Sequence, residues 1–183
     1  MRTTLAAAAL SAAALTLVSA GAAHAELYGI DDPEDTFHGS DIRALSVRNG
    51  QENVTVTTVH DNLVRRAASG SAETVFVDTD RHDRGPEFVF VAGLYEGTDY
   101  LLRATDGFDR SSWGEPVENG DYVLRVRYRK DVARVVMSRA ALGNPDEVRV
   151  AVRASGTRTD GTSHGLLDWV GERRSFTPWL SRG

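Results

Sequence analysis

Residues 75–90 read VFVDTDRHDRGPEFVF, and this stretch indicates how the chain folds. Two apolar runs rich in β-branched and aromatic residues, Val75–Val77 and Phe88–Val91, flank a polar segment that contains Gly85-Pro86. Runs of this composition are typical of β-strands, and a Gly-Pro connection between them is typical of a surface turn. We therefore predict a strand, an acidic turn and a second strand.

The predicted turn carries four carboxylates, those of Asp78, Asp80, Asp83 and Glu87. A hard cation such as Ca²⁺ takes about six to eight oxygen ligands, and closely spaced carboxylates supply several of them. The spacing departs from the EF-hand pattern, because the third acid comes one residue late and no glycine follows the aspartate. The alternative is a solvated turn in which Asp78 and Asp80 accept backbone hydrogen bonds while Arg81 and Arg84 balance the charge. A structural Ca²⁺ held by the four acids is the cofactor prediction.

Other strands are expected on both sides of this unit. Asn53–His60, NVTVTTVH, is heavily β-branched and follows the turn signal Asn49-Gly50. Tyr122–Met137 is predicted to be a hairpin, because apolar residues alternate with arginines before Lys130-Asp131 and an apolar run follows. The remaining predicted strands are Asp41–Arg48, Thr98–Ala104 and Glu147–Ala154.

Short strands separated by turn signals, with no long amphipathic helix, are typical of an all-β domain. We predict a single antiparallel β-sandwich, jelly-roll or immunoglobulin-like, of about eight strands. One brief helical or 3₁₀ turn is expected at Ser138–Leu142, closed by Gly143.

The N-terminal 25 residues have the features of an export signal. Arg2 gives a positive start, Leu5–Ala20 is apolar, and Ala23-His24-Ala25 is a small-x-small cleavage pattern. A permanent membrane anchor is the alternative, but the apolar run is shorter than the roughly 20 residues of a bilayer span and contains hydroxyl residues. We predict a cleaved signal peptide (residues 1–25), an acidic arm (residues 26–40), and a sandwich domain (residues 41–183).

The acidic arm allows two interpretations. It is either a flexible N-terminus or an extended segment that lies beside the first strand. Its apolar residues favour the second interpretation: they are Leu27, Tyr28, Ile30 and Phe37.

Charge and cysteine content restrict the classes of function. Removing the leader removes Arg2, so the formal net charge changes from −5 to 20 − 26 = −6. An acidic chain without clustered Lys and Arg is not expected to bind nucleic acid, and we predict no membrane span after leader cleavage. The chain contains no cysteine, which excludes disulfides, thiolate metal sites and Cys nucleophiles. Together with the leader, this favours a secreted, extracellular bacterial protein.

A catalytic site finds little support in the sequence. Gly161-Thr162-Ser163-His164-Gly165 matches the G-x-S-x-G nucleophile elbow, but a polar segment precedes it and no histidine follows His164. The histidines show no metal-ligand spacing either. A hydrolase is therefore the third-ranked function, and we predict that the protein is not an enzyme.

Aromatic side chains are the best candidates for ligand contacts. Trp113 stands in a polar loop, where an exposed ring would stack on a sugar; Tyr95 and Tyr100 are the other candidates. Trp169 and Trp179 are instead expected to cover one end of the core.

Short motifs across residues 41–154 resemble carbohydrate-binding family 9-like and DOMON-like domains of exported bacterial proteins. They are Asp41-Ile42, Phe76-Val77-Asp78-Thr79-Asp80, Asp99-Tyr100-Leu101-Leu102 and the segment Val135–Gly143. One position differs from that pattern, because the proline usual before the Ser-x-x-Leu-Gly turn is Met137 here. The resemblance implies a β-sandwich and carbohydrate binding.

The predicted function is that of a secreted, non-catalytic β-sandwich that binds an extracellular glycan and holds a structural Ca²⁺. The alternative is an envelope protein whose sandwich face meets another protein and takes no small ligand.

Overall fold

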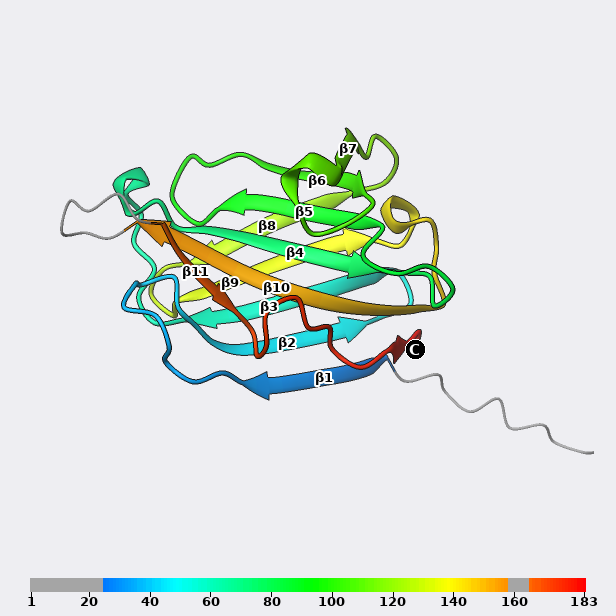
Figure 1. Ribbon diagram of the computed structural model, residues 1–183, viewed down its shortest axis with the longest axis horizontal. Coiled ribbons are helices and arrows are strands. Elements are labelled where there is room, and N and C mark those ends of the chain that lie inside the picture. Colours follow the sequence, from blue (N-terminus) through cyan, green and yellow to red (C-terminus); the bar gives the residue numbers. More distant parts are fainter. Residues whose placement is uncertain (1–24, 158–164) are drawn as a thin grey trace, which may run out of the picture.

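The computed structural model describes residues 25–157 and 165–183, which form two antiparallel sheets packed face to face (Figure 1). One sheet has five strands in the order β1-β2-β3-β9-β8. The other has seven, in the order β11-β10-β4-β5-β6-β7, with β12 beside β10. Residues 1–24 of the predicted leader lie outside the described part of the chain.

The elements have the following bounds. The five-stranded sheet consists of β1 (Glu26–Asp31), β2 (Ile42–Asn49), β3 (Asn53–His60), β8 (Tyr122–Arg127) and β9 (Val132–Ser138). The seven-stranded sheet consists of β4 (Ala72–Asp78), β5 (Phe88–Gly93), β6 (Tyr100–Thr105), β7 (Trp113–Pro116), β10 (Glu147–Thr157), β11 (Gly165–Trp169) and β12 (Leu180–Ser181). Three 3₁₀ turns connect strands: η1 (Ala67–Ser69), η2 (Arg110–Ser112) and η3 (Ala140–Leu142).

The strand–turn–strand unit predicted from residues 75–90 is confirmed. β4 and β5 pair antiparallel with Val75 opposite Phe90. The hairpin of β8 and β9 is confirmed as well, with Leu124 opposite Val135, and β3 has the predicted bounds. The all-β class and antiparallel pairing are therefore as expected.

The predicted number of about eight strands is wrong, because the described residues form twelve. The additional strands are β1, β7, β11 and β12, in stretches that were expected to be an arm, a loop and a tail. β7 and β12 are short, and none of the four has a long apolar–polar alternation. Pairing with a neighbouring strand, more than local composition, makes them β-structure.

Alternating side chains of both sheets meet in one core. Val56 and Val135 project from the five-stranded sheet, and Phe90 and Val150 from the seven-stranded sheet; each is almost completely buried. Period-2 alternation produces this arrangement, because every second residue of a strand points to the same face.

Of the two interpretations of the acidic arm, the structure supports the extended segment. β1 pairs with β2 along its whole length, with Tyr28 opposite Val47. Tyr28 packs against the core, whereas Leu27 is 67% exposed and Phe37, in the loop after β1, is 95% exposed.

A polar network is buried at one end of the sandwich interior. Thr58 donates its hydroxyl hydrogen bond to Glu73 Oε2 at 2.5 Å, and His60 Nε2 lies 3.3 Å from the same oxygen. His60 Nδ1 contacts the Ser40 carbonyl at 2.8 Å. All these side chains are closed off from solvent, so the network fixes how the two sheets pack.

Gly143 closes η3 as predicted, and its backbone conformation leads to a first testable prediction. Its φ is 75°, in the left-handed region, and a Cβ there would meet no atom within 4 Å. Gly143→Ala should therefore lower the free energy of unfolding by about 1–2 kcal/mol through backbone strain alone. Urea denaturation measures the loss. Gly114→Ala, at a position without positive φ, is the control and should change little.

None of the described residues belongs to a helix long and apolar enough to cross a membrane.

Candidate functional site

The outer face of the seven-stranded sheet carries a second apolar layer, separate from the sandwich core. Phe76, Val89 and Ala151 point to this face and are buried. Side chains from the segment after β6, from the end of β11 and from the segment after β11 cover them. The Phe76 ring lies 4.8 Å from the Phe108 ring and is stacked on Trp169 at 5.8 Å between centroids. Arginines alternate with apolar residues along β10, yet this face of the strand is covered by aromatic segments that fold back over it.

Arginines lie among these aromatic rings. Arg153 is 5.7 Å from the Phe76 ring centroid and 5.5 Å from that of Trp169. Arg149, four positions before Arg153 on the same face of β10, lies over Phe176 and Trp179 at 4.5 and 4.8 Å. Guanidinium groups stack well on aromatic faces, so the apolar layer accommodates these cations.

Arg153 is a cation without a carboxylate partner among residues 25–157 and 165–183. Its Nη2 donates a hydrogen bond to Thr74 Oγ1 at 3.3 Å, while its buried Nε has no acceptor in the described part of the chain. Burial lowers the pKa of Arg153, and the nearby charges of Arg110 and Arg174 lower it further. Arg174 is paired with Asp109 at 2.6 Å, whereas Arg110 and Arg153 have no carboxylate partner in the described part of the chain, so two unpaired cations lie here on a chain that is acidic as a whole.

A groove opens beside this group. Arg110, Trp113 and Arg153 line it together with Tyr95 and Asp99. Its volume of about 520 Å³ falls within the roughly 300–1,000 Å³ of small-molecule sites. Arg110 lies over the Trp113 ring at 5.7 Å, so a cation and an aromatic wall face the same space.

The structure brings two of the three predicted ligand residues together. Tyr95 and Trp113 line the same groove although they are far apart in sequence. Tyr100 does not join them. It points to the inner side of β6, where its ring lies 5.8 Å from Phe90 and 6.2 Å from Tyr122. The sequence analysis did not name Arg110 or Arg153 as ligand residues. The alternation in EVRVAVRA (residues 147–154) indicates that Arg153 lies on the face opposite the core, but it does not indicate a groove there.

Trp169 and Trp179 were expected to cover one end of the core. Trp169 lies instead in the outer apolar layer, and Trp179 has Arg149 and Arg81 over its ring at 4.8 and 4.7 Å. The expectation was wrong for Trp169, because a sandwich has two outer faces as well as ends.

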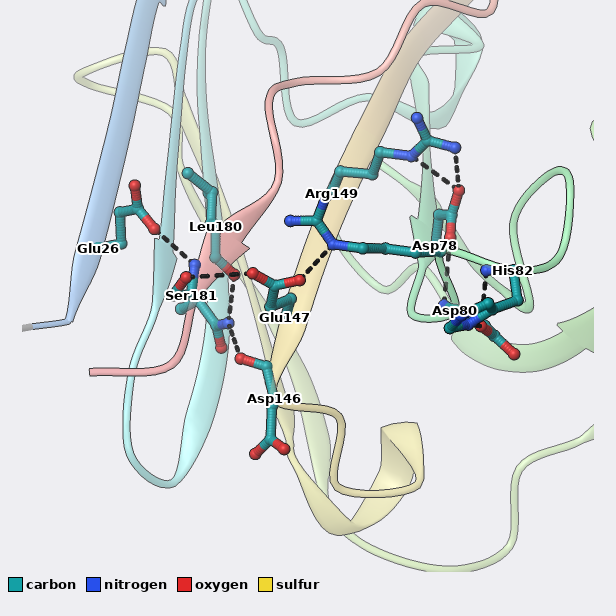
Figure 2. A network of polar contacts seen from close by, with 11 residues as sticks. Glu26, Asp78, Asp80, His82, Asp146, Glu147, Arg149, Leu180 and Ser181 are labelled. Atoms are coloured by element: carbon teal, nitrogen blue, oxygen red, sulfur yellow. Dashed lines mark hydrogen bonds and ion pairs between the residues drawn. The ribbon is translucent and has the colours of Figure 1, made fainter.

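The acidic turn lies at an end of the sandwich, where it meets the start of β10 and the C-terminal segment (Figure 2). Asp78 is fully buried and forms a two-point ion pair with Arg149, at 2.8 Å from Nε and 2.6 Å from Nη2. Burial raises the pKa of Asp78 above its ordinary value, and the Arg149 contacts oppose that rise. Asp78 therefore acts as a structural anion.

The other acids of the turn also accept hydrogen bonds from the protein. Asp80 accepts from the His82 backbone N–H at 2.8 Å, and this bond lowers the pKa of Asp80. Asp83 accepts from the Arg84 N–H at 2.7 Å. Glu87 accepts from the Thr79 N–H and hydroxyl at 2.5 and 3.0 Å, while burial raises the pKa of Glu87.

These contacts match the alternative of a self-capped turn, and Ca²⁺ on this turn stays a prediction. A polar chain continues from it: Arg81 pairs with Glu147, whose other oxygen lies 3.3 Å from the Ser181 hydroxyl, and the Ser181 N–H donates to Glu26 at 2.5 Å (Figure 2). Through Arg81, the turn is thus connected to β10, and through Glu147 and Ser181 to β12 and β1. Among residues 25–157 and 165–183, three acids whose oxygens approach one another lie elsewhere in the fold: Asp35, Asp41 and Asp168.

No known protein-family model matches the chain, and no curated protein matches it either. The resemblance to carbohydrate-binding family 9-like and DOMON-like domains therefore stays a prediction. Within the G-x-S-x-G sequence, Ser163 and its neighbours from Gly161 to His164 lie outside the described residues.

Proposed function

We propose that this protein is a non-catalytic binding domain whose outer groove takes an acidic glycan. The observation that carries the proposal is Arg153, a cation beside Arg110 and Arg174 that lacks a carboxylate partner among the described residues. A ligand carboxylate would supply the missing charge, and a charge-assisted bond to a partly desolvated guanidinium is among the stronger polar contacts.

The aromatic wall supports a sugar as the carrier of that carboxylate. Trp113 and Tyr95 are aromatic residues that line the groove, and Asp99 and Ser155 are polar residues that line it as well. A uronic acid combines an apolar ring face, hydroxyl groups and a carboxylate. The aromatic residues, the polar lining residues and Arg153 are their respective counterparts in the groove. Secretion, predicted from the leader, would bring the domain to extracellular polysaccharides.

Binding assays with matched variants test this function. Wild-type protein is expected to bind polygalacturonate and not a neutral galactan, as measured by calorimetry with soluble oligosaccharides. Arg153→Met should weaken binding about 10–100-fold, because a charge-assisted hydrogen bond contributes about 1.5–3 kcal/mol. Trp113→Ala should weaken it about 10-fold. Methionine keeps the packing against Phe76, so the fold should persist.

Arg125→Met is the matched control. Arg125 is exposed on β8, directly opposite Arg134 of β9, in a second arginine group on the other sheet. The Arg125→Met variant should change the affinity less than about twofold. Arg125 can attract an anionic polymer only by its charge, which salt screens, and it makes no contact in the groove. Equal losses in the Arg125 and Arg153 variants would contradict the groove as the binding site.

A protein partner is the second candidate function, and exposed apolar residues favour it. Leu27, on edge strand β1, is 67% exposed, and Phe37 is 95% exposed. An edge strand offers unpaired backbone groups to another chain. If this surface carries the function, Leu27→Ser and Phe37→Ser would abolish partner capture, while the groove variants would leave it unchanged.

A further inference from the structure

A group of carboxylates gathers away from the acidic turn, and none of its members lines the groove. Oxygens of Asp35, Asp41 and Asp168 all lie within 4.8 Å of one another. They come from the loop after β1, the residue before β2, and β11. Asp168 is opposite Ala154 near the end of β10, whereas the acidic turn meets β10 at Arg149 near its start.

Two carboxylate oxygens at this place are buried without a hydrogen-bond donor among the described residues. Asp168 is 3% exposed; its Oδ2 accepts the Ile42 N–H at 2.5 Å, but its Oδ1 has no partner. Asp32 is 7% exposed; its Oδ1 accepts the Gly171 N–H at 2.8 Å, and its Oδ2 has no partner. A buried carboxylate that lacks donors destabilises the fold unless a cation or a proton neutralises it.

The protein's own cations do not balance the charge. Arg43, the one cationic side chain paired with this group in the described part of the chain, lies 3.3 Å from Asp41 Oδ2 and 3.2 Å from Glu34. Burial raises the pKa of Asp168 to about 7, and the nearby charges of Asp35, Asp32 and Asp41 add to that rise. One guanidinium, which Glu34 shares, is therefore the only paired cation that the described residues offer to the carboxylates of Asp32, Asp35, Asp41 and Asp168.

Hydrogen bonds within the protein position the carboxylates of this group, and one of them is accessible from solvent. Asp41 is fully buried, and its Oδ1 accepts hydrogen bonds from the Asp35 N–H at 3.3 Å and from the Thr36 N–H and hydroxyl at 2.9 Å each. These bonds keep Asp35 beside Asp41. The Asp35 side chain is itself exposed, which leaves a route from solvent.

We propose that Asp35, Asp41 and Asp168 bind one Ca²⁺, with Asp32 as a neighbouring carboxylate. The donors are oxygens alone, which favours a hard cation over Zn²⁺, whose sites use His or Cys. Ca²⁺ tolerates an irregular set of carboxylates and waters, whereas Mg²⁺ demands near-octahedral geometry. The ion would join the β1–β2 connection to β11, segments far apart in the sequence.

Thermal unfolding and calorimetry of the full-length protein, freed of metal with EDTA and then dialysed, test the site. Addition of about 1 mM CaCl₂ should raise the midpoint temperature by about 5–10 °C, since a ligand that binds only the folded state stabilises it. Calorimetry should give one Ca²⁺ per chain. Asp168→Asn should lose both signals. Asp35→Asn, at an exposed position where folding is not at risk, should also lose most of the affinity.

The double variant Asp80→Asn/Asp83→Asn is the control, because it removes two exposed acids of the turn and leaves the Asp35–Asp41–Asp168 group intact. It should keep the full shift. A wild-type protein without any Ca²⁺-dependent shift or heat would overturn the proposal, as would loss of the shift in this double variant. An equal response to MgCl₂ would overturn the assignment to Ca²⁺. None of these outcomes depends on glycan binding.

Discussion

Arg149→Ala is expected to lower the free energy of unfolding by about 3–5 kcal/mol, because it leaves the carboxylate of Asp78 buried without its partner. Asp78 is fully buried, and Arg149 meets its Oδ2 from both Nε and Nη2. Natural domains have about 5–15 kcal/mol of stability in total, so this loss is severe. Urea denaturation measures it.

The stability lost in the Arg149→Ala variant should come from the unpaired, buried charge of Asp78 rather than from the loss of a strong attraction between Asp78 and Arg149. Burial raises the pKa of Asp78 even with Arg149 in place, so the pair itself contributes little net stability. The double variant Asp78→Asn/Arg149→Met should therefore recover most of the loss. Arg81→Ala, which breaks the more exposed pair with Glu147, should cost less than about 1 kcal/mol. Equal losses in the Arg81 and Arg149 variants would contradict this account.

Phe76→Ala is the second large effect, with an expected loss of about 3–5 kcal/mol. Phe76 lies on the outer face of the seven-stranded sheet, yet it is completely buried between Phe108 and Trp169. The outer layer therefore behaves as a second core. Phe90→Ala, in the core between the sheets, should cost a similar amount. A loss below about 1 kcal/mol for Phe76→Ala in urea denaturation would show that the outer layer is only loosely packed.

Sequence reasoning predicted the longer strands well, because their side chains alternate or are strongly β-branched. Asn53–His60 and the hairpin from Tyr122 are examples: alternate side chains of β3 and β9 are buried, and the apolar side chains of β8, an edge strand, are half-buried. The short strands were harder to predict. β7 and β12 are short, and they are strands only because β6 and β10 lie beside them. Local sequence does not contain that information.

The candidate sites depend even more on tertiary contacts. The acidic turn was visible in the sequence, but Arg149, which neutralises Asp78, comes from β10. Tyr95 and Trp113 were named as separate aromatics, and only the fold places them in one groove with Arg153. Asp168 could not be linked to Asp41 in advance, since their proximity depends on how β11 pairs with β10.

The central claim is that the groove on the outer face of the seven-stranded sheet takes an acidic sugar. A ¹H–¹⁵N NMR titration with trigalacturonate tests it most directly. We expect shifts of the Trp113 indole signal and of backbone amides at Thr74, Val91 and Arg153, which line or border the groove. Signals of Tyr100 and of the acidic turn should stay in place. No shifts at the groove, or shifts confined to the face that carries Arg125 and Arg134, would contradict the claim.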